Sequence, residues 1–157
     1  MHSRIFQVSK NKITEDNRIE EYRYDDGFVG RVADYVVKQD DIKSDLEWLT
    51  TCHKGIEVTR NGKTVKLTIV SREEYFEKSF EEFKEGLKKL SEYTMADFID
   101  SKNWLDFWRL KDSYDNEHGF YVDDNDEYFG IATFDEFMRN TEDGDVYYIG
   151  NVFDYHS

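Results

Sequence analysis

A β-hairpin followed directly by an amphipathic helix is the feature that most restricts how this chain can fold. Residues 56–70 contain two runs of alternating apolar and polar side chains, separated by Asn61-Gly62. Asn-Gly is favoured at the centre of a type I′ turn, because both central positions need positive φ. The spacing therefore predicts a hairpin with a two-residue turn, in which Val58 faces Val65 on the apolar side.

The helix predicted at 71–93 starts with a capping box, in which Ser71 is the cap and Glu74 stands three residues later. Its apolar residues step by four, three, four and three and form one stripe: Phe76, Phe80, Phe83, Leu87 and Leu90. We expect the stripe to pack on the preceding hairpin. A partner helix is the alternative, although the stripe is shorter than the roughly three to four heptads of a coiled coil.

The remaining elements follow from the same periodicities and from turn and cap residues. Strands are predicted at 4–8, 120–122, 128–131 and 146–155, and helices at 40–52, 95–100, 104–110 and 133–140. The segment 28–37 fits either a helix or a strand. Together these elements predict a single α+β domain over 1–157, with an antiparallel sheet built from hairpins and two to four helices packed on it.

The charge of the chain is concentrated in its last part. Residues 94–157 hold 4 basic and 16 acidic residues, which is −12 of the total −14, and 15 of the 26 aromatic rings. Disordered acidic segments lack rings at this density, so we expect 94–157 to fold and to present an acidic surface. By contrast, 55–93 holds 8 basic and 8 acidic residues and is predicted to be a neutral scaffold.

The predicted partner-binding residues all lie in that acidic part. Trp104 and Trp108 stand in a helical segment whose rings spread too widely for one buried stripe, and Trp is enriched at the centres of interfaces. The alternative is that two of the three rings of Trp104, Phe107 and Trp108 belong to the core. The acidic cluster is expected at a hairpin tip: Asp123, Asp124, Asp126 and Glu127. We expect that neutralising Asp123, Asp124 and Asp126 together weakens a complex with a basic partner.

A cation site is the second interpretation of the same cluster, because Ca²⁺ prefers carboxylate and amide oxygens. A loop started at Asp124 would place Ile131 and Asp135 at EF-hand positions 8 and 12. It would also place Phe129 where that loop requires glycine, and no helix precedes it. We therefore predict no metal site and no cofactor; if a cation binds, its ligands are Asp123, Asp124 and Asp126.

The sequence contains no motif that defines an enzyme. HExxH, CxxC, GxSxG and Walker patterns do not occur. Cys52 and His53 are adjacent, but a Cys–His dyad is a spatial arrangement. Cys52 is also expected at a helix C-terminus, where the helix dipole does not lower the pKa of a thiol. We expect a protein without catalytic activity.

The first functional hypothesis is a small acidic protein that binds and inhibits a basic or nucleic-acid-binding protein. By composition it is analogous to nucleic-acid mimics and to immunity proteins. Its charge argues against direct contact with nucleic acids or anionic membranes. The alternatives are a divalent-cation-dependent module or enzyme, and a homodimeric accessory protein. The lone Cys52 and the absence of an apolar leader suggest the cytoplasm of a bacterium or of a phage-infected cell.

Overall fold

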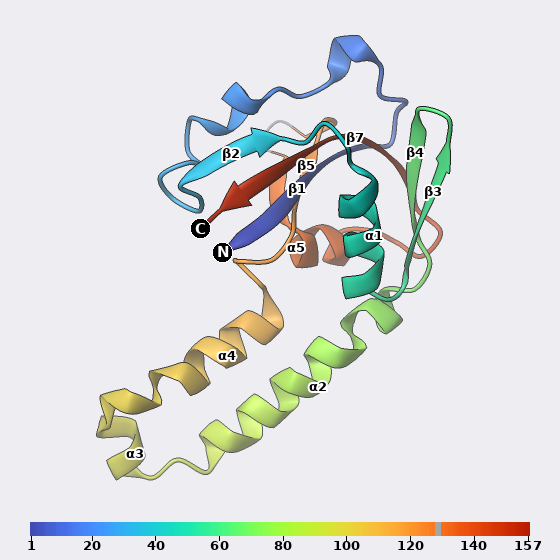
Figure 1. The fold of residues 1–157 in the computed structure, drawn as a ribbon. Coiled ribbons are helices and arrows are strands. Elements are labelled where there is room, and N and C mark those ends of the chain that lie inside the picture. Colours follow the sequence, from blue (N-terminus) through green and yellow to red (C-terminus); the bar gives the residue numbers. More distant parts are fainter. Residues whose placement is uncertain (128–129) are drawn as a thin grey trace.

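The computed structural model describes residues 1–127 and 130–157, and it contains a central sheet, five α-helices and three short 3₁₀ helices in that part of the chain (Figure 1). The strands are β1 (His2–Ser9), β2 (Tyr35–Lys38), β3 (Ile56–Asn61), β4 (Thr64–Ile69), β5 (Tyr121–Asp124), β6 (Ile131–Thr133) and β7 (Val146–His156). The helices are α1 (Lys43–Cys52), α2 (Arg72–Ser91), α3 (Met95–Ile99), α4 (Trp104–Tyr114) and α5 (Phe134–Arg139), with 3₁₀ turns η1 (Glu15–Asn17), η2 (Glu21–Tyr24) and η3 (Ser101–Asn103).

The predicted mixture of helices and a single sheet is confirmed, but the sheet is not purely antiparallel. Its order is β3-β4-β7-β1-β5-β6, and β2 also pairs with β7. Strands β1 and β5 run parallel, with Ile5 opposite Tyr121. Parallel neighbours need a long connection, and more than a hundred residues separate these two strands. Hairpin signals identify only strands that are neighbours in the sequence, so they could not reveal this pair.

The predicted hairpin is present, but its register differs by two residues. Val58 pairs with Leu67, and Asn61 with Thr64, so that Gly62 and Lys63 form the turn. Gly62 has a φ of 62°, and no residue other than glycine has positive φ among the described residues. This is the pattern of a type II′ turn, which places glycine first. Since the shift is even, the predicted apolar face is kept.

The sheet is covered on both faces. Helices α1 and α5 cover one face, where Leu49 and Met138 are fully buried with Phe6 and Val152. The segment between β1 and β2 covers the other face and buries Tyr24. Figure 1 shows this segment lying across β1, β2 and β7. Covered faces explain why most residues of β1 and β7 are buried.

The other helices leave the sheet. Residues 72–114, here called the arm, contain α2, α3 and α4 and project from the remaining chain, here called the body (Figure 1). Only part of the α2 stripe packs against α4, where Phe83 lies 6.0 Å from Tyr114 between ring centroids. Phe76 borders the core, and Phe80 and Leu87 stay exposed, which corrects the prediction that the whole stripe packs on the hairpin. A Cβ on Gly86 would lie 3.1 Å from Leu110, so this glycine permits the close approach of the two helices.

Helix α5 holds both legs of the arm. The carboxylate of Asp135 accepts hydrogen bonds from the Tyr75 hydroxyl at 2.8 Å and from the Asn116 backbone N–H at 2.9 Å. One turn later, Arg139 donates a hydrogen bond to the Tyr114 carbonyl, and its guanidinium carbon lies 4.1 Å from the centroid of the Tyr114 ring. The two residues therefore contact α2 and the end of α4 together, and they fix where the arm leaves the body.

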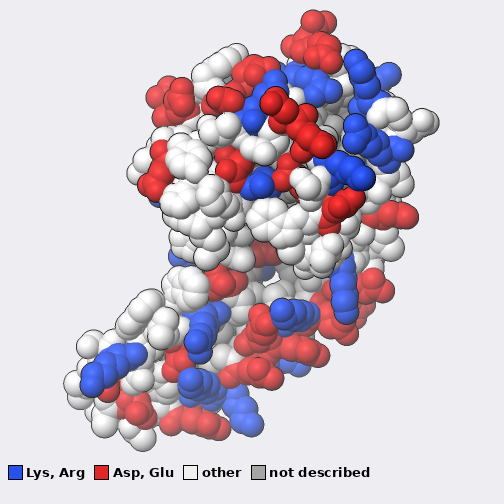
Figure 2. Space-filling view, viewed as in Figure 1, with Lys and Arg blue, Asp and Glu red and all other residues white. Residues whose placement is uncertain are grey.

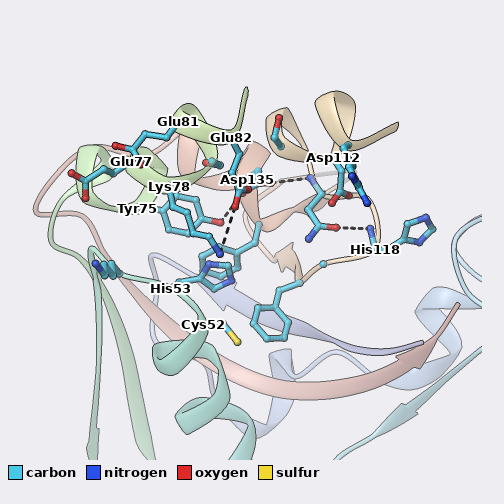
Figure 3. Close-up of a pocket in the computed structure, with 18 of the residues that line it drawn as sticks. Cys52, His53, Tyr75, Glu77, Lys78, Glu81, Glu82, Asp112, His118 and Asp135 are labelled. Atoms are coloured by element: carbon cyan, nitrogen blue, oxygen red, sulfur yellow. Dashed lines mark hydrogen bonds and ion pairs between the residues drawn. The ribbon is translucent and has the colours of Figure 1, made fainter. Parts of the chain in front are cut away.

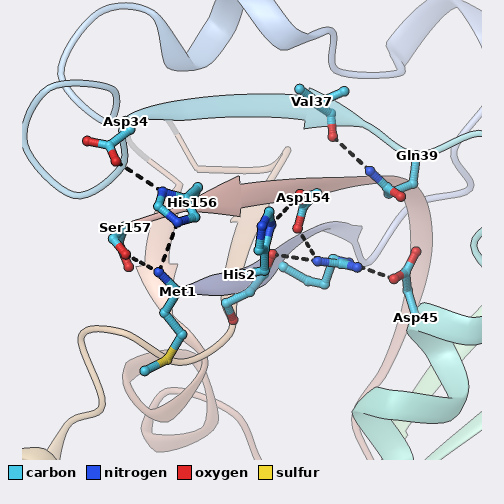
Figure 4. A network of polar contacts seen from close by, with 11 residues as sticks. Met1, His2, Asp34, Val37, Gln39, Asp45, Asp154, His156 and Ser157 are labelled. Atoms are coloured by element: carbon cyan, nitrogen blue, oxygen red, sulfur yellow. Dashed lines mark hydrogen bonds and ion pairs between the residues drawn. The ribbon is translucent and has the colours of Figure 1, made fainter.

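Polar contacts tie the first and last strands to their surroundings (Figure 4). Arg4 forms ion pairs with Asp154 and, at 2.6 Å, with the buried Asp45 of α1. At the ends of the same strands, the His2 ring lies 2.9 Å from Asp154, and the His156 ring lies 3.0 Å from Asp34. Within the described residues, no helix has the length and apolar character needed to cross a membrane.

Candidate functional site

A cleft of about 1180 Å³ separates the arm from the body (Figure 3). The end of α1 and the residues after it form one wall, and the inner sides of α2 and α4 form the opposite wall. The loop that follows α4 and the first turn of α5 close one end. The cleft therefore exists because α5 holds the arm away from the sheet.

Aromatic rings form the floor of the cleft, and His53 lies among them. The His53 ring stacks on Phe134 and on Tyr75, with 5.3 Å and 5.1 Å between ring centroids. Phe120 approaches the same ring edge-on, with 5.3 Å between centroids. Trp48 extends this floor by packing on Phe120 at 4.9 Å. Burial among these rings lowers the pKa of His53, although the charge of Asp135 acts in the opposite direction.

The lowered pKa of His53 predicts a stability that depends on pH. The folded protein binds this proton less readily than the unfolded chain, in which the pKa is near 6.5. We expect the free energy of unfolding to be highest above pH 6.5 and to fall as the pH drops through the folded-state pKa. Urea unfolding between pH 7.5 and 5.5 measures this. In the His53→Phe variant, the free energy of unfolding should change less with pH over that range. An equal pH dependence in both proteins would contradict the assignment to His53.

Acidic side chains dominate the walls of the cleft. Eight carboxylates line it, namely Glu74, Glu77, Glu81, Glu82, Glu85, Asp106, Asp112 and Asp135. Four basic side chains line it, namely Lys54, Lys78, Lys89 and Arg109. Five of the carboxylates come from α2, and four of these, Glu74, Glu77, Glu81 and Glu85, recur every three or four residues and so share one side of the helix. Figure 2 shows acidic residues gathered along the middle of the arm.

Part of this charge is neutralised within the arm. Lys89 pairs with Asp106 at 2.7 Å, and Lys78 lies 3.7 Å from Glu82. The carboxylate of Asp112, in contrast, makes no hydrogen bond or ion pair with any residue that the structure describes, and the residue is half-buried. Burial raises the pKa of Asp112, the charge of His118 acts in the opposite direction, and the carboxylates of Asp135 and Glu82 raise this pKa further. An unpaired carboxylate in this position favours a cation from outside the chain.

The predicted acidic cluster does not form one exposed tip. Asp123 belongs to β5, is completely buried, and accepts two hydrogen bonds from the Arg23 guanidinium at 2.5 and 2.8 Å. It therefore cannot contribute to a partner surface, which corrects the prediction. Asp124 is half-buried, and burial raises its pKa. The exposed Asp126 accepts hydrogen bonds from the hydroxyl of Ser9 at the end of β1 and from the backbone N–H of Lys10, and Glu127 is exposed beside it.

The two predicted tryptophans lie elsewhere. Trp104 and Trp108 are on α4 with 60% and 43% of their surface exposed, and neither lines the cleft. The structure thus separates the tryptophans of the arm from the acids beside β5, instead of bringing them together. The predicted strand 128–131 begins with two residues that lie outside the described part of the chain.

Neither metal nor thiol chemistry gains support from the described residues. They contain no group of three or more His, Cys, Asp or Glu side chains placed to hold a metal ion. Cys52 is exposed at the C-terminal end of α1, as predicted. It lines the cleft, but no hydrogen bond joins it to His53 or to another described residue.

The glutamates of α2 are the one feature of the cleft that is visible in the sequence. Helical periodicity assigns them to an ordinary solvent-facing side, because nothing in the sequence places α1 opposite them. Comparisons with known proteins add no further constraint, since no family model, curated protein or solved structure matches the chain. The cleft and the arm are therefore the basis for the functional argument.

Proposed function

We propose that this chain is a protein-binding module that receives a basic segment of a partner protein in the cleft between arm and body. The observation that carries the proposal is the composition of the cleft walls, with eight carboxylates against four basic side chains above an aromatic floor. Opposite charge on the two surfaces accelerates association and selects the partner.

The size and the floor of the cleft support a polypeptide occupant. Its volume of about 1180 Å³ exceeds the roughly 300–1,000 Å³ of ordinary small-molecule pockets. Arg and Lys side chains bind well against aromatic faces, and Trp48 already has the Arg4 guanidinium 5.1 Å from its ring centroid. An arginine-containing segment could pair with Asp112 and lay its alkyl stem on the rings.

The proposed mode of action is inhibition by occupancy. A basic segment held in the cleft is unavailable for contacts with phosphates or with other acidic surfaces. This retains the function expected from composition, but it moves the binding site from the acids beside β5 to the inner side of the arm. The exposed Asp126 and Glu127 then contribute only long-range attraction.

Two triple variants test the site with the same change in net charge. The cleft variant carries Glu77→Gln, Glu81→Gln and Asp112→Asn. The control carries Glu15→Gln, Glu57→Gln and Glu142→Gln, at exposed positions outside the cleft. The probe is a fluorescein-labelled peptide of alternating Arg and Leu, measured by fluorescence anisotropy at low and high salt.

We expect the cleft variant to bind the peptide about tenfold or more weakly, which corresponds to about 1.4 kcal/mol. The control variant should bind the peptide with nearly the affinity of the wild type. Equal losses in both variants would mean that binding follows net charge alone, and no binding at low salt would reject the basic-segment proposal.

A further inference from the structure

The arm carries most of the exposed apolar surface of the protein. Ten of its large apolar side chains are between 41% and 74% exposed, namely Phe80, Leu87, Met95, Phe98, Ile99, Trp104, Leu105, Phe107, Trp108 and Tyr114. None of the ten lines the cleft. The arm therefore has a charged inner side and an apolar outer side, and Figure 2 shows few charged residues at its free end.

The summed apolar surface of the arm is sufficient for an interface. A fully exposed large side chain contributes about 150–250 Å². Ten side chains at these exposures, distributed over α2, α3 and α4, thus present on the order of 1,000 Å² in total. A stable interface buries about 800 Å² on each partner, so the arm offers enough surface for one.

We propose that a second copy of this chain covers the outer side of the arm, and that the two arms lie antiparallel about a two-fold axis. In a two-fold dimer the same patch meets itself, so it must be self-complementary. The apolar residues run from Phe80 and Tyr114 near the body to Phe98 and Ile99 at the free end. Antiparallel arms place the free end of each against the base of the other.

The distribution of charge supports this arrangement. Of the acidic residues in the first half of α2, Glu74, Glu77 and Glu81 line the cleft, so a contact through the outer side leaves their charges out of the interface. Residues 72–114 have 8 basic and 11 acidic residues, compared with 1 and 12 for 115–157. Contact through the arms thus keeps the most acidic segments apart.

The oligomeric state of the whole protein tests the proposal. Sedimentation equilibrium over the micromolar range should give twice the 18.8 kDa chain mass. Leu87→Glu and Phe98→Glu each place a charge on the outer side and should raise the dimer dissociation constant about tenfold or more. Lys78→Glu on the inner side should leave it near the wild-type value. Circular dichroism checks that the helices persist in every variant.

A spin label at the free end tests the orientation. Lys102→Cys in a Cys52→Ser background gives one label on each copy, near η3. Antiparallel arms hold the two labels about one helix length apart, roughly 30 Å for the 20 residues of α2. A much shorter distance would overturn the antiparallel arrangement. A monomer at the highest concentration would overturn the dimer, whatever the result of the peptide-binding test.

Discussion

Replacing Arg23 by Met is expected to lower the free energy of unfolding at pH 7 by about 3 kcal/mol. Asp123 is fully buried, and Arg23 supplies two hydrogen bonds to its carboxylate. Removing the guanidinium leaves a buried charge without its partner, which is among the most costly single changes in a protein. Arg23 is about one third exposed, so the loss belongs at the lower end of the usual range for buried pairs.

The measurement is urea unfolding followed by fluorescence or circular dichroism. Lys10→Met is the matched control, because Lys10 forms an exposed pair with Asp145 at 3.5 Å and such pairs contribute little. Adding Asp123→Asn to Arg23→Met removes the isolated charge and should recover part of the loss. Equal stabilities of the Arg23 and Lys10 variants would contradict the assignment of a buried ion pair.

The second large effect is expected for Gly55→Ala, with a loss of about 3 kcal/mol or more. Gly55 has a φ of 70°, and a Cβ built on it would lie 2.0 Å from the Ser71 carbonyl oxygen. Its own carbonyl accepts hydrogen bonds from Val70 at 2.9 Å and from Ser71 at 3.0 Å. The added methyl group would therefore separate β3 from the start of α2.

Gly62→Ala is the control for the backbone conformation alone. Gly62 also has positive φ, but nothing lies within 4 Å of its Cβ position. We expect a loss of about 1–2 kcal/mol, from the left-handed conformation only. Thermal unfolding of both variants measures the difference. A smaller loss of stability for Gly55→Ala than for Gly62→Ala would show that the backbone at Gly55 and Ser71 can move apart at little cost. The connection of β3 to α2 would then not depend on this close contact.

Local signals in the sequence correctly predicted where three of the helices begin. The hydroxyls of Ser71, Thr94 and Thr133 each accept a hydrogen bond from the backbone N–H three residues later, as expected for caps. These interactions join neighbouring residues, so a short stretch of sequence contains all the information. Strand β7 was likewise predicted from its alternation, and it proves to be central in the sheet.

Long-range partners could not be predicted in the same way. Asp123 looked like a member of an exposed acidic turn, because its ion-pair partner Arg23 lies one hundred residues away. The stripe of α2 looked suited to the hairpin, because nothing local reveals that α4 returns beside it. The cleft has the same origin, since its floor and its walls come from segments that meet only in the folded chain.

The acidity of the last third has partly structural uses. Asp115 accepts a hydrogen bond from the Thr133 hydroxyl, Asp143 accepts one from the Arg72 backbone, and Asp154 pairs with Arg4. Together with Asp123 and Asp135, these carboxylates hold the body together and attach the arm to it. Net charge alone therefore overstates the charge available to a partner, and the position of each carboxylate decides its role.

The attachment of the arm makes the protein modular. Of all the residues in α2, α3 and α4, only Tyr75 belongs to the buried core, and both legs meet at one short helix of the body. Mutations along the rest of the arm can therefore accumulate without disturbing the packing of the sheet. Such an arrangement lets evolution exchange binding partners by changing one extension, while the fold that carries it stays the same.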